Sequence, residues 1–241
     1  MSYIYFMKLK PFLILAICTM ALSSCMKPII NPDGSLNIDK NTGGDGGSTP
    51  LSNADTYQPV TKGSTWTYAV ALSGQNYSTT GTMTGDRTIF NGKTYYNIAA
   101  TATLQGAASG TSYFYSSQHV YANRGTSIVA NVTVEMPYLI DTVAVGHTWK
   151  AQVNDSGVIN GTQGRFVGTM VERNIAKTVA GKSYSNVMHT QIDLQYNVQG
   201  TFQSFGTYDY YIAKGVGVIE LDASAFGMTI SNEVLTSYSI K

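Results

Sequence analysis

His189 and Asp193 share one face of the strand that the sequence predicts most clearly. Apolar and polar residues alternate from 188 to 198, which is typical of a half-buried strand. Side chains two apart in a strand point the same way, so Gln191 lies between this pair on the polar face. These residue types could bind a metal ion or transfer protons. We expect an ordinary solvated strand face instead, because antiparallel sheets commonly expose one polar side.

Familiar catalytic signatures do not accompany this pair. The sequence contains no Gly-x-Ser-x-Gly elbow, no His-Glu-x-x-His and no Gly-x-Gly-x-x-Gly. The three histidines, His119, His147 and His189, share no short ligand spacing, and the acidic residues are scattered. We therefore predict no catalytic residues, no metal site and no cofactor. A hydrolase with a dispersed site is the least favoured function.

A covalent modification is the chemistry that the sequence indicates most strongly, at Cys25. Residues 22–25, Leu-Ser-Ser-Cys, resemble the lipobox that lipoprotein signal peptidase cuts in bacteria. Lys8 and Lys10 precede an apolar run, 11–22, that is shorter than the roughly 20 residues of a spanning helix. A basic start, an apolar run and small residues at the cut are typical of a signal peptide.

This pattern predicts removal of residues 1–24 and lipid attachment at Cys25. Two or more acyl chains anchor a protein stably, so the membrane is the expected partner. The other cysteine, Cys18, would be lost, which leaves the mature chain without a disulfide. We expect a cell-envelope protein on the periplasmic face of the outer membrane, because no acidic cluster of the kind linked to surface export follows the lipobox.

Composition divides the remaining chain into a tether and one domain. Prolines at 28, 32 and 50 and the glycine-rich run 43–48 predict a flexible tether over 25–56. A single β domain is expected over 57–241. Charged residues make up 12% of the chain, against about 25% in average proteins, which favours an extracytoplasmic β domain over a helical enzyme. With 15 basic and 14 acidic residues, the chain has no electrostatic reason to bind nucleic acid.

Short strands and tight turns are predicted throughout the domain. Trp66, Tyr68 and Val70 alternate with small or polar residues, as in a half-buried strand. The dipeptide at 91–92, Asn-Gly, separates two β-rich segments and indicates a type I′ hairpin. A short helix would fit within 136–145, although the proline at 137 argues against a long one.

Later segments resemble earlier ones in the same order. Residues 63–66, Gly-Ser-Thr-Trp, resemble 146–149, Gly-His-Thr-Trp, and 91–97 resemble 180–186. These matches indicate either a duplication or the chance similarity of two hairpins.

From the repeats we infer two halves, 57–140 and 141–241. Trp66 and Trp149 hold equivalent places in these halves, so we predict that both are buried. The expected fold is all-β, an antiparallel meander that curves into a half-barrel or open barrel, with a β-sandwich as the alternative.

Three motifs carry a resemblance to a known group of proteins. They are Gly63-x-x-Trp66-x-Tyr68, Asn91-Gly92-Lys93-x-Tyr95-Tyr96 and Tyr211-Ile212-Ala213-Lys214-Gly215-Val216-Gly217. Over about 57–240 the chain resembles a group of uncharacterised bacterial lipoproteins. Its architecture is more loosely similar to half-barrel lipoprotein carriers that hold lipid acyl chains. The resemblance implies a shared fold more than a shared activity.

Together these observations favour a lipid-anchored protein with a non-enzymatic binding role. An apolar molecule, a glycan or a protein partner would be bound. The alternative is a structural component of the envelope or of an assembly. An apolar cavity inside the domain would favour binding, whereas a filled interior would favour the structural role.

Replacing Cys25 with alanine tests the predicted anchor. We expect Cys25→Ala to give an uncleaved or soluble precursor, because the sulfur that carries the lipid is lost. Radiolabelled fatty acid should mark the wild type and not the variant. Equal labelling of the two proteins would contradict lipid attachment at this residue.

Overall fold

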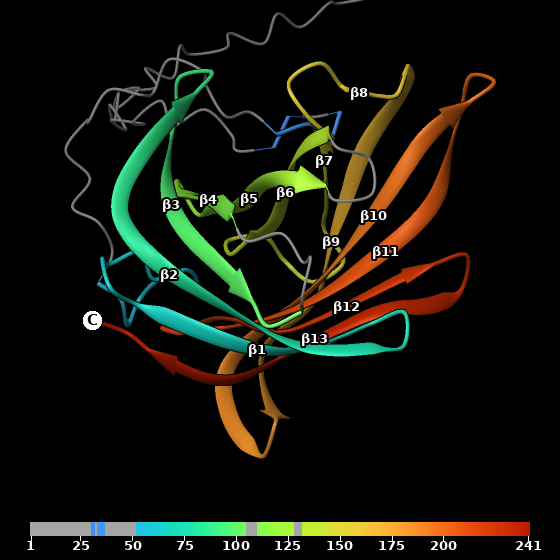
Figure 1. Ribbon diagram of the computed structural model, residues 1–241. Coiled ribbons are helices and arrows are strands. Elements are labelled where there is room, and N and C mark those ends of the chain that lie inside the picture. The colour runs from blue at the N-terminus through green and yellow to red at the C-terminus, as the bar shows by residue number, and fades with distance from the viewer. Residues whose placement is uncertain (1–29, 32, 37–51, 105–109, 128–131) are drawn as a thin grey trace, which may run out of the picture.

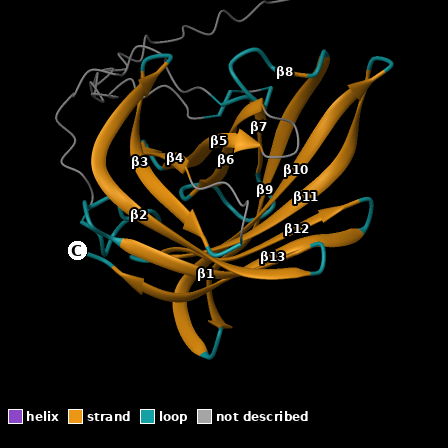
Figure 2. Cartoon of the chain, viewed as in Figure 1, coloured by secondary structure: helices purple, strands orange, loops and turns teal. Residues whose placement is uncertain are grey.

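Thirteen antiparallel strands form one continuous curved sheet (Figure 1 and Figure 2). The computed structural model describes residues 30–31, 33–36, 52–104, 110–127 and 132–241. The strands are β1 (Thr65–Leu72), β2 (Gln75–Phe90), β3 (Lys93–Ala102), β4 (Gly110–Ser117), β5 (Val120–Ser127), β6 (Val132–Ile140), β7 (Thr148–Gln152), β8 (Val158–Ile159), β9 (Thr162–Val179), β10 (Lys182–Val198), β11 (Thr201–Ala213), β12 (Gly217–Ala225) and β13 (Met228–Ser239). Within these residues no helix is long and apolar enough to cross a membrane.

Most neighbours in the sheet are also neighbours in the chain. The order is β6-β5-β4-β3-β2-β1-β13-β12-β11-β10-β9-β7, and β8 pairs with β9 off this path. The ladder between β1 and β13 joins the first strand to the last, so the sheet curls into a nearly closed barrel (Figure 1). An unsealed seam remains between the edge strands β6 and β7. The predicted all-β open barrel is confirmed, and the alternative of a β-sandwich is not what forms.

The two halves of the barrel correspond strand for strand. The first half contains β1–β6, and the second contains β7 and β9–β13 with the short β8 inserted. In each half a long hairpin joins the second and third strands, and both turn residues have positive φ, at 91–92 and at 180–181. The repeated motifs therefore hold equivalent places, while their origin by duplication stays a hypothesis.

Trp66 and Trp149 occupy the same place in the two halves, and both are buried, as predicted. Three residues before each lies a glycine with positive φ. Across the ladder, Trp66 faces Gly81 and Trp149 faces Gly168. Each indole N–H donates to a main-chain carbonyl, at 2.6 Å for Trp66 and 3.1 Å for Trp149. Both indoles thus pack and hydrogen-bond as parts of the core.

An N-terminal segment pairs with the free edge of β7. The amide of Leu36 donates to the carbonyl of Lys150 at 3.1 Å, and the amide of Lys150 donates to the carbonyl of Gly34 at 2.6 Å. Ile30 and Leu36 pack against the core. At these positions the predicted tether lies against the barrel. Cys25 and most of the other residues predicted as signal peptide and tether lie outside the described residues.

β6 packs against the inner face of the sheet rather than beside β7. Tyr138, Leu139 and Ile140 are fully buried in succession, and the Thr190 hydroxyl of β10 donates to the Tyr138 carbonyl at 2.6 Å. The short helix that would fit within 136–145 is therefore wrong. A continuous apolar run does not distinguish a buried strand from a helix, which is why the sequence was ambiguous there.

Four charged side chains, which we call the seam network, connect β6 to the loop after β7. Arg124 donates to Asp155 through both terminal nitrogens, at 3.2 and 2.8 Å, and to Glu135 at 3.2 Å. Lys93 donates to Glu135 at 2.7 Å. Because Arg124 is buried, these pairs compensate a desolvated charge and fix the loop beside β6.

Substitution of Gly168 tests the packing of the second tryptophan. A Cβ at Gly168 would lie 2.1 Å from Cε2 of Trp149, so the indole or the strand would have to move. We expect Gly168→Ala to lower the free energy of unfolding by about 1–3 kcal/mol, as overpacked cores do. Gly110→Ala is the control, since its Cβ would meet no atom within 4 Å. Equal midpoints in urea for both variants would contradict this packing.

The seam network also predicts a pH dependence. The hydrogen bond from Arg124 holds the pKa of Asp155 below its ordinary value. The Asp155 carboxylate therefore stabilises the folded state above its pKa in the unfolded chain, about 3.9. This stabilisation is lost as the pH falls through its lower pKa in the folded state. Asp155→Asn should cost about 1 kcal/mol at pH 7, because the carboxylate is partly screened by solvent.

Urea unfolding at pH 7 and at pH 2–3 measures this difference. The difference in free energy of unfolding between Asp155→Asn and the wild type, which is the gap expected at pH 7, should disappear at the acidic pH. Asp86→Asn, at an exposed aspartate of β2, should show no such gap at either pH. A gap for Asp155→Asn that persists at pH 2 would show that charge is not its cause.

Candidate functional site

His189 lies on the outer face of the sheet, as the alternation predicts, but Asp193 is not its partner. Its Nδ1 lies 3.0 Å from Glu172 Oε2 and its Nε2 lies 3.0 Å from Asp209 Oδ1. The ring stacks on Tyr211 at 4.2 Å between centroids. The predicted solvated face is therefore a packed, charge-paired cluster. Among the described residues, no group of three or more His, Cys, Asp or Glu residues could hold a metal ion.

Asp193 and the other histidines take no part in this cluster. Asp193 accepts hydrogen bonds from Ser204 at 2.5 Å and from Gln195 at 2.7 Å. His147 is exposed in the turn before β7, and His119 lies in the turn before β5. The three histidines thus lie in separate places.

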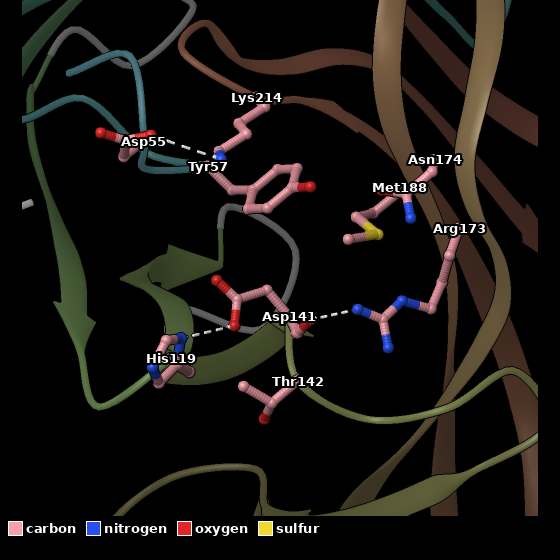
Figure 3. A pocket seen from close by; sticks show the side chains of 9 residues that line it. All are labelled: Asp55, Tyr57, His119, Asp141, Thr142, Arg173, Asn174, Met188 and Lys214. Atoms are coloured by element: carbon pink, nitrogen blue, oxygen red, sulfur yellow. Dashed lines mark hydrogen bonds and ion pairs between the residues drawn. The ribbon is translucent and has the colours of Figure 1, made fainter. Parts of the chain in front are cut away.

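An open depression of about 660 Å³, which we call the mouth, lies where residues 55–57 meet the end of β6 (Figure 3). It is lined by Asp55, Tyr57, His119, Asp141, Thr142, Arg173, Asn174, Met188 and Lys214. These residues come from six separate parts of the chain, and only the closure of the barrel brings them together.

The charged groups of the mouth are largely paired with one another. His119 Nδ1 lies 2.8 Å from Asp141 Oδ1, and Lys214 Nζ lies 3.4 Å from Asp55 Oδ1. Arg173 donates to the carbonyls of Asp141 and Val143. Its guanidinium therefore holds the chain after β6 in place instead of facing a ligand (Figure 3).

The His119–Asp141 pair has the geometry of an oriented general base. The second carboxylate oxygen of Asp141 accepts a hydrogen bond from Tyr121 at 3.0 Å. Within the described part of the chain, however, no hydroxyl or thiol hydrogen-bonds to the other ring nitrogen of His119. The described residues therefore supply an oriented base but no side-chain nucleophile beside it.

The segment 56–59 separates the mouth from the interior of the barrel. All four of its residues are buried, and the carbonyl of Thr56 accepts a hydrogen bond from the amide of Gly215 at 2.8 Å. Tyr57 faces the mouth, whereas the next side chain, Gln58, accepts a hydrogen bond from the Tyr138 hydroxyl at 3.0 Å. This segment therefore forms a wall with one face outside and one face inside.

Behind this wall lies a cavity of about 130 Å³, which we call the inner cavity. Its lining is Gln58, Trp66, Tyr68, Ile98, Phe114, Asn123, Tyr138, Tyr210, Val218, Leu221 and Glu233. The buried core of the barrel is divided into two hydrophobic clusters, one with Tyr138 and Tyr210 and the other with Trp66 and Ile98. The inner cavity lies between them, because it takes wall residues from both.

Most polar tips in the inner cavity are bonded within the protein. Tyr68 donates to the carbonyl of Val218 at 2.9 Å, and Tyr210 donates to the sulfur of Met136 at 3.3 Å. Glu233 is different, because no described residue hydrogen-bonds or ion-pairs with its carboxylate. The aromatic side chains thus present ring surface to the cavity, and Glu233 supplies an uncompensated acid.

The position of Glu233 in the sheet explains its electrostatics. On β13 it is paired with Val70 of β1 and Leu221 of β12, so apolar residues flank it on both sides. Burial raises the pKa of the Glu233 carboxyl. Burial, and after it the negative charge of Glu233, raises the pKa of Tyr68 as well, which places the two groups close together.

Sequence reasoning did not single out Glu233. In β13, Glu233 and Leu235 point to one face and Asn232 and Val234 to the other. Each face mixes polar and apolar residues, so alternation does not say which side is inside. The only available signal was an acid two residues before the leucine that proves to be buried.

Comparisons with known proteins found two similar structures and no matching family. No protein-family model matches the chain, and no curated protein matches it significantly. One similar structure is described as an exported protein with a YmcC-like fold from Bacteroides fragilis NCTC 9343, with 10% identity, a TM-score of 0.47 and coverage of 75% of this chain and 97% of that one. Another, a lipoprotein from Parabacteroides distasonis ATCC 8503, has 8% identity, a TM-score of 0.49 and coverage of 77% and 99%. At these values the likeness carries no functional argument.

Replacing the Glu233 carboxylate with a neutral amide tests whether its negative charge destabilises the folded state. A carboxyl whose pKa is raised on folding contributes stability below its unfolded pKa and loses it as the pH rises through the folded value. We therefore expect Glu233→Gln to be more stable than the wild type at pH 7, and this advantage should shrink toward pH 4. Urea unfolding at both values measures it. A variant that is less stable at pH 7 would indicate a favourable partner for the carboxylate.

Proposed function

We propose that this chain is a lipid-anchored protein of the bacterial cell envelope that binds a small molecule inside its barrel. The anchor rests on the lipobox at 22–25, and the membrane is the partner that the acylated Cys25 would contact. The outer membrane, on its periplasmic side, is the proposed location. The binding role rests on one observation, the inner cavity between the two core clusters.

The size of the inner cavity restricts the ligand. Pockets for drug-sized molecules measure roughly 300–1,000 Å³. At about 130 Å³ the inner cavity is closer to an engineered protein cavity of about 150 Å³ that binds benzene. A ligand of about six non-hydrogen atoms therefore fits, and a lipid acyl chain does not. The likeness to acyl-chain carriers thus does not extend to this interior.

An unfilled cavity also counts against a purely structural role. In mutational series, space left open inside a packed core lowers stability in proportion to its volume. One larger side chain at the wall would remove most of this cost. A barrel that served only as a scaffold would gain stability from such a filled interior, whereas a binding protein needs the space.

Binding is also favoured over catalysis. The residues of the mouth pair with one another, and its His119–Asp141 pair has no nucleophile among the described residues. In the inner cavity, an aromatic wall with a few convergent polar groups is the usual composition of a ligand site.

A fragment screen on two matched variants tests this function. Leu221→Trp should fill the inner cavity, and Ile89→Trp adds the same ring at a site that is 69% exposed on β2. We expect fragments of up to about six non-hydrogen atoms to bind the wild type and Ile89→Trp but not Leu221→Trp, in ligand-observed NMR. The proposed function is wrong if no fragment separates the two variants.

A further inference from the structure

The inner cavity combines two features that point to one kind of ligand. Its single acid, Glu233, has no hydrogen-bonding or ion-pairing partner among the described residues. Five of the other lining residues, Trp66, Tyr68, Phe114, Tyr138 and Tyr210, are aromatic. Among the described residues, the lining contains no lysine, arginine or histidine.

A carboxylate in such surroundings lacks the compensation that buried charges normally have. The flanking Val70 and Leu221 partly shield it from water, and no described residue offers it a cation. A bound positive group would supply the missing charge and would also donate hydrogen bonds to the carboxylate oxygens. The nearby aromatic rings favour the same charge, because their faces are electron-rich.

We propose that the ligand of the inner cavity is a small organic ammonium ion, held with its charge at Glu233 and its alkyl part against the aromatic rings. This inference rests on the proposed binding function and adds the chemical class. The ammonium group would be bonded by Glu233, with the Asn123 side chain as a second polar contact. The cavity volume limits the ion to about six non-hydrogen atoms, and n-butylammonium, with about five, is within that limit.

Other classes fit the lining less well. An anion would meet Glu233 with no cationic lining residue to offset the repulsion. A neutral alcohol could donate one hydrogen bond to the carboxylate but would leave its charge uncompensated. A lipid acyl chain exceeds the volume.

Three probes of matched size separate these classes: n-butylamine, n-butanol and sodium butyrate at pH 7. We expect n-butylamine, which is protonated at this pH, to bind the wild type at least about tenfold more tightly than n-butanol, because hydrogen bonds to charged groups are the stronger ones. Butyrate should not bind measurably. Titrations followed by protein NMR give the affinities, and shifts in the Trp66 indole N–H resonance place the ligand in the inner cavity.

Two substitutions identify the group responsible. Glu233→Gln should bring n-butylamine down to the affinity of n-butanol while leaving n-butanol itself unchanged, which also shows that the variant is folded. Glu172→Gln, at an acid on the outer face, should keep the wild-type preference. Leu221→Trp should abolish binding of all three probes.

The outcomes separate this inference from the function on which it depends. Equal binding of n-butylamine and n-butanol to the wild type, or an unchanged preference in Glu233→Gln, overturns the ammonium assignment and leaves small-molecule binding in place. If no probe or screened fragment binds, or if binding survives in Leu221→Trp, both proposals fail.

Discussion

The barrel depends on a single ladder between the first and last strands, because that ladder converts a long meander into a curved wall with an interior. Thr65–Leu72 of β1 pairs with residues 231–239 of β13, with one bulge at 67–68. Each backbone N–H and C=O along an unpaired edge would otherwise need another partner. Pairing these two strands leaves only β6 and β7 as edges. The seam and the inner cavity follow from how these two edge strands pack.

If the two halves corresponded fully, a second ladder would join the edge strands β6 and β7. In the first position, β1 pairs with β13. In the equivalent position, β7 would pair with β6, but residues 34–36 pair with β7 instead. The strand β6 is thereby free to move inward, where Trp149 and the Arg124 ion pairs hold it by side-chain hydrogen bonds. The departure from symmetry thus replaces a backbone ladder with side-chain hydrogen bonds and ion pairs.

The inward position of β6 explains the inner cavity. Tyr138 reaches across the interior to Gln58 and stacks on Tyr210, so one wall of the cavity exists only because β6 is inside. A sheet of this curvature has more inner space than its side chains fill, and two core clusters form with a gap between them. The acids elsewhere in the barrel are mostly paired or exposed. Glu233 is set apart because it borders this gap without a partner among the described residues.

The sequence by itself determined the class of fold and much of its internal order. Alternation along 188–198, the Asn-Gly turn at 91–92 and the paired tryptophans are local patterns, and local patterns report strand faces, hairpins and repeats directly. The sequence also indicated the lipobox at Cys25, which lies outside the described residues. In contrast, His189 was placed on the correct face but was expected to be solvated, because its contacts come from neighbouring strands 17 and 20 residues away in the sequence.

Only the tertiary structure decided which residues surround the inner cavity. Its lining comes from the segment before β1 and from eight strands of both halves, and alternation in β13 does not reveal that Glu233 points inside. Nor does sequence show that a strand with three consecutive buried residues, at 138–140, lies within the barrel rather than forming a helix. Strand faces follow from a period of two along the chain, whereas a cavity depends on how far the sheet curls and which edge turns inward, and those are set by contacts between distant residues.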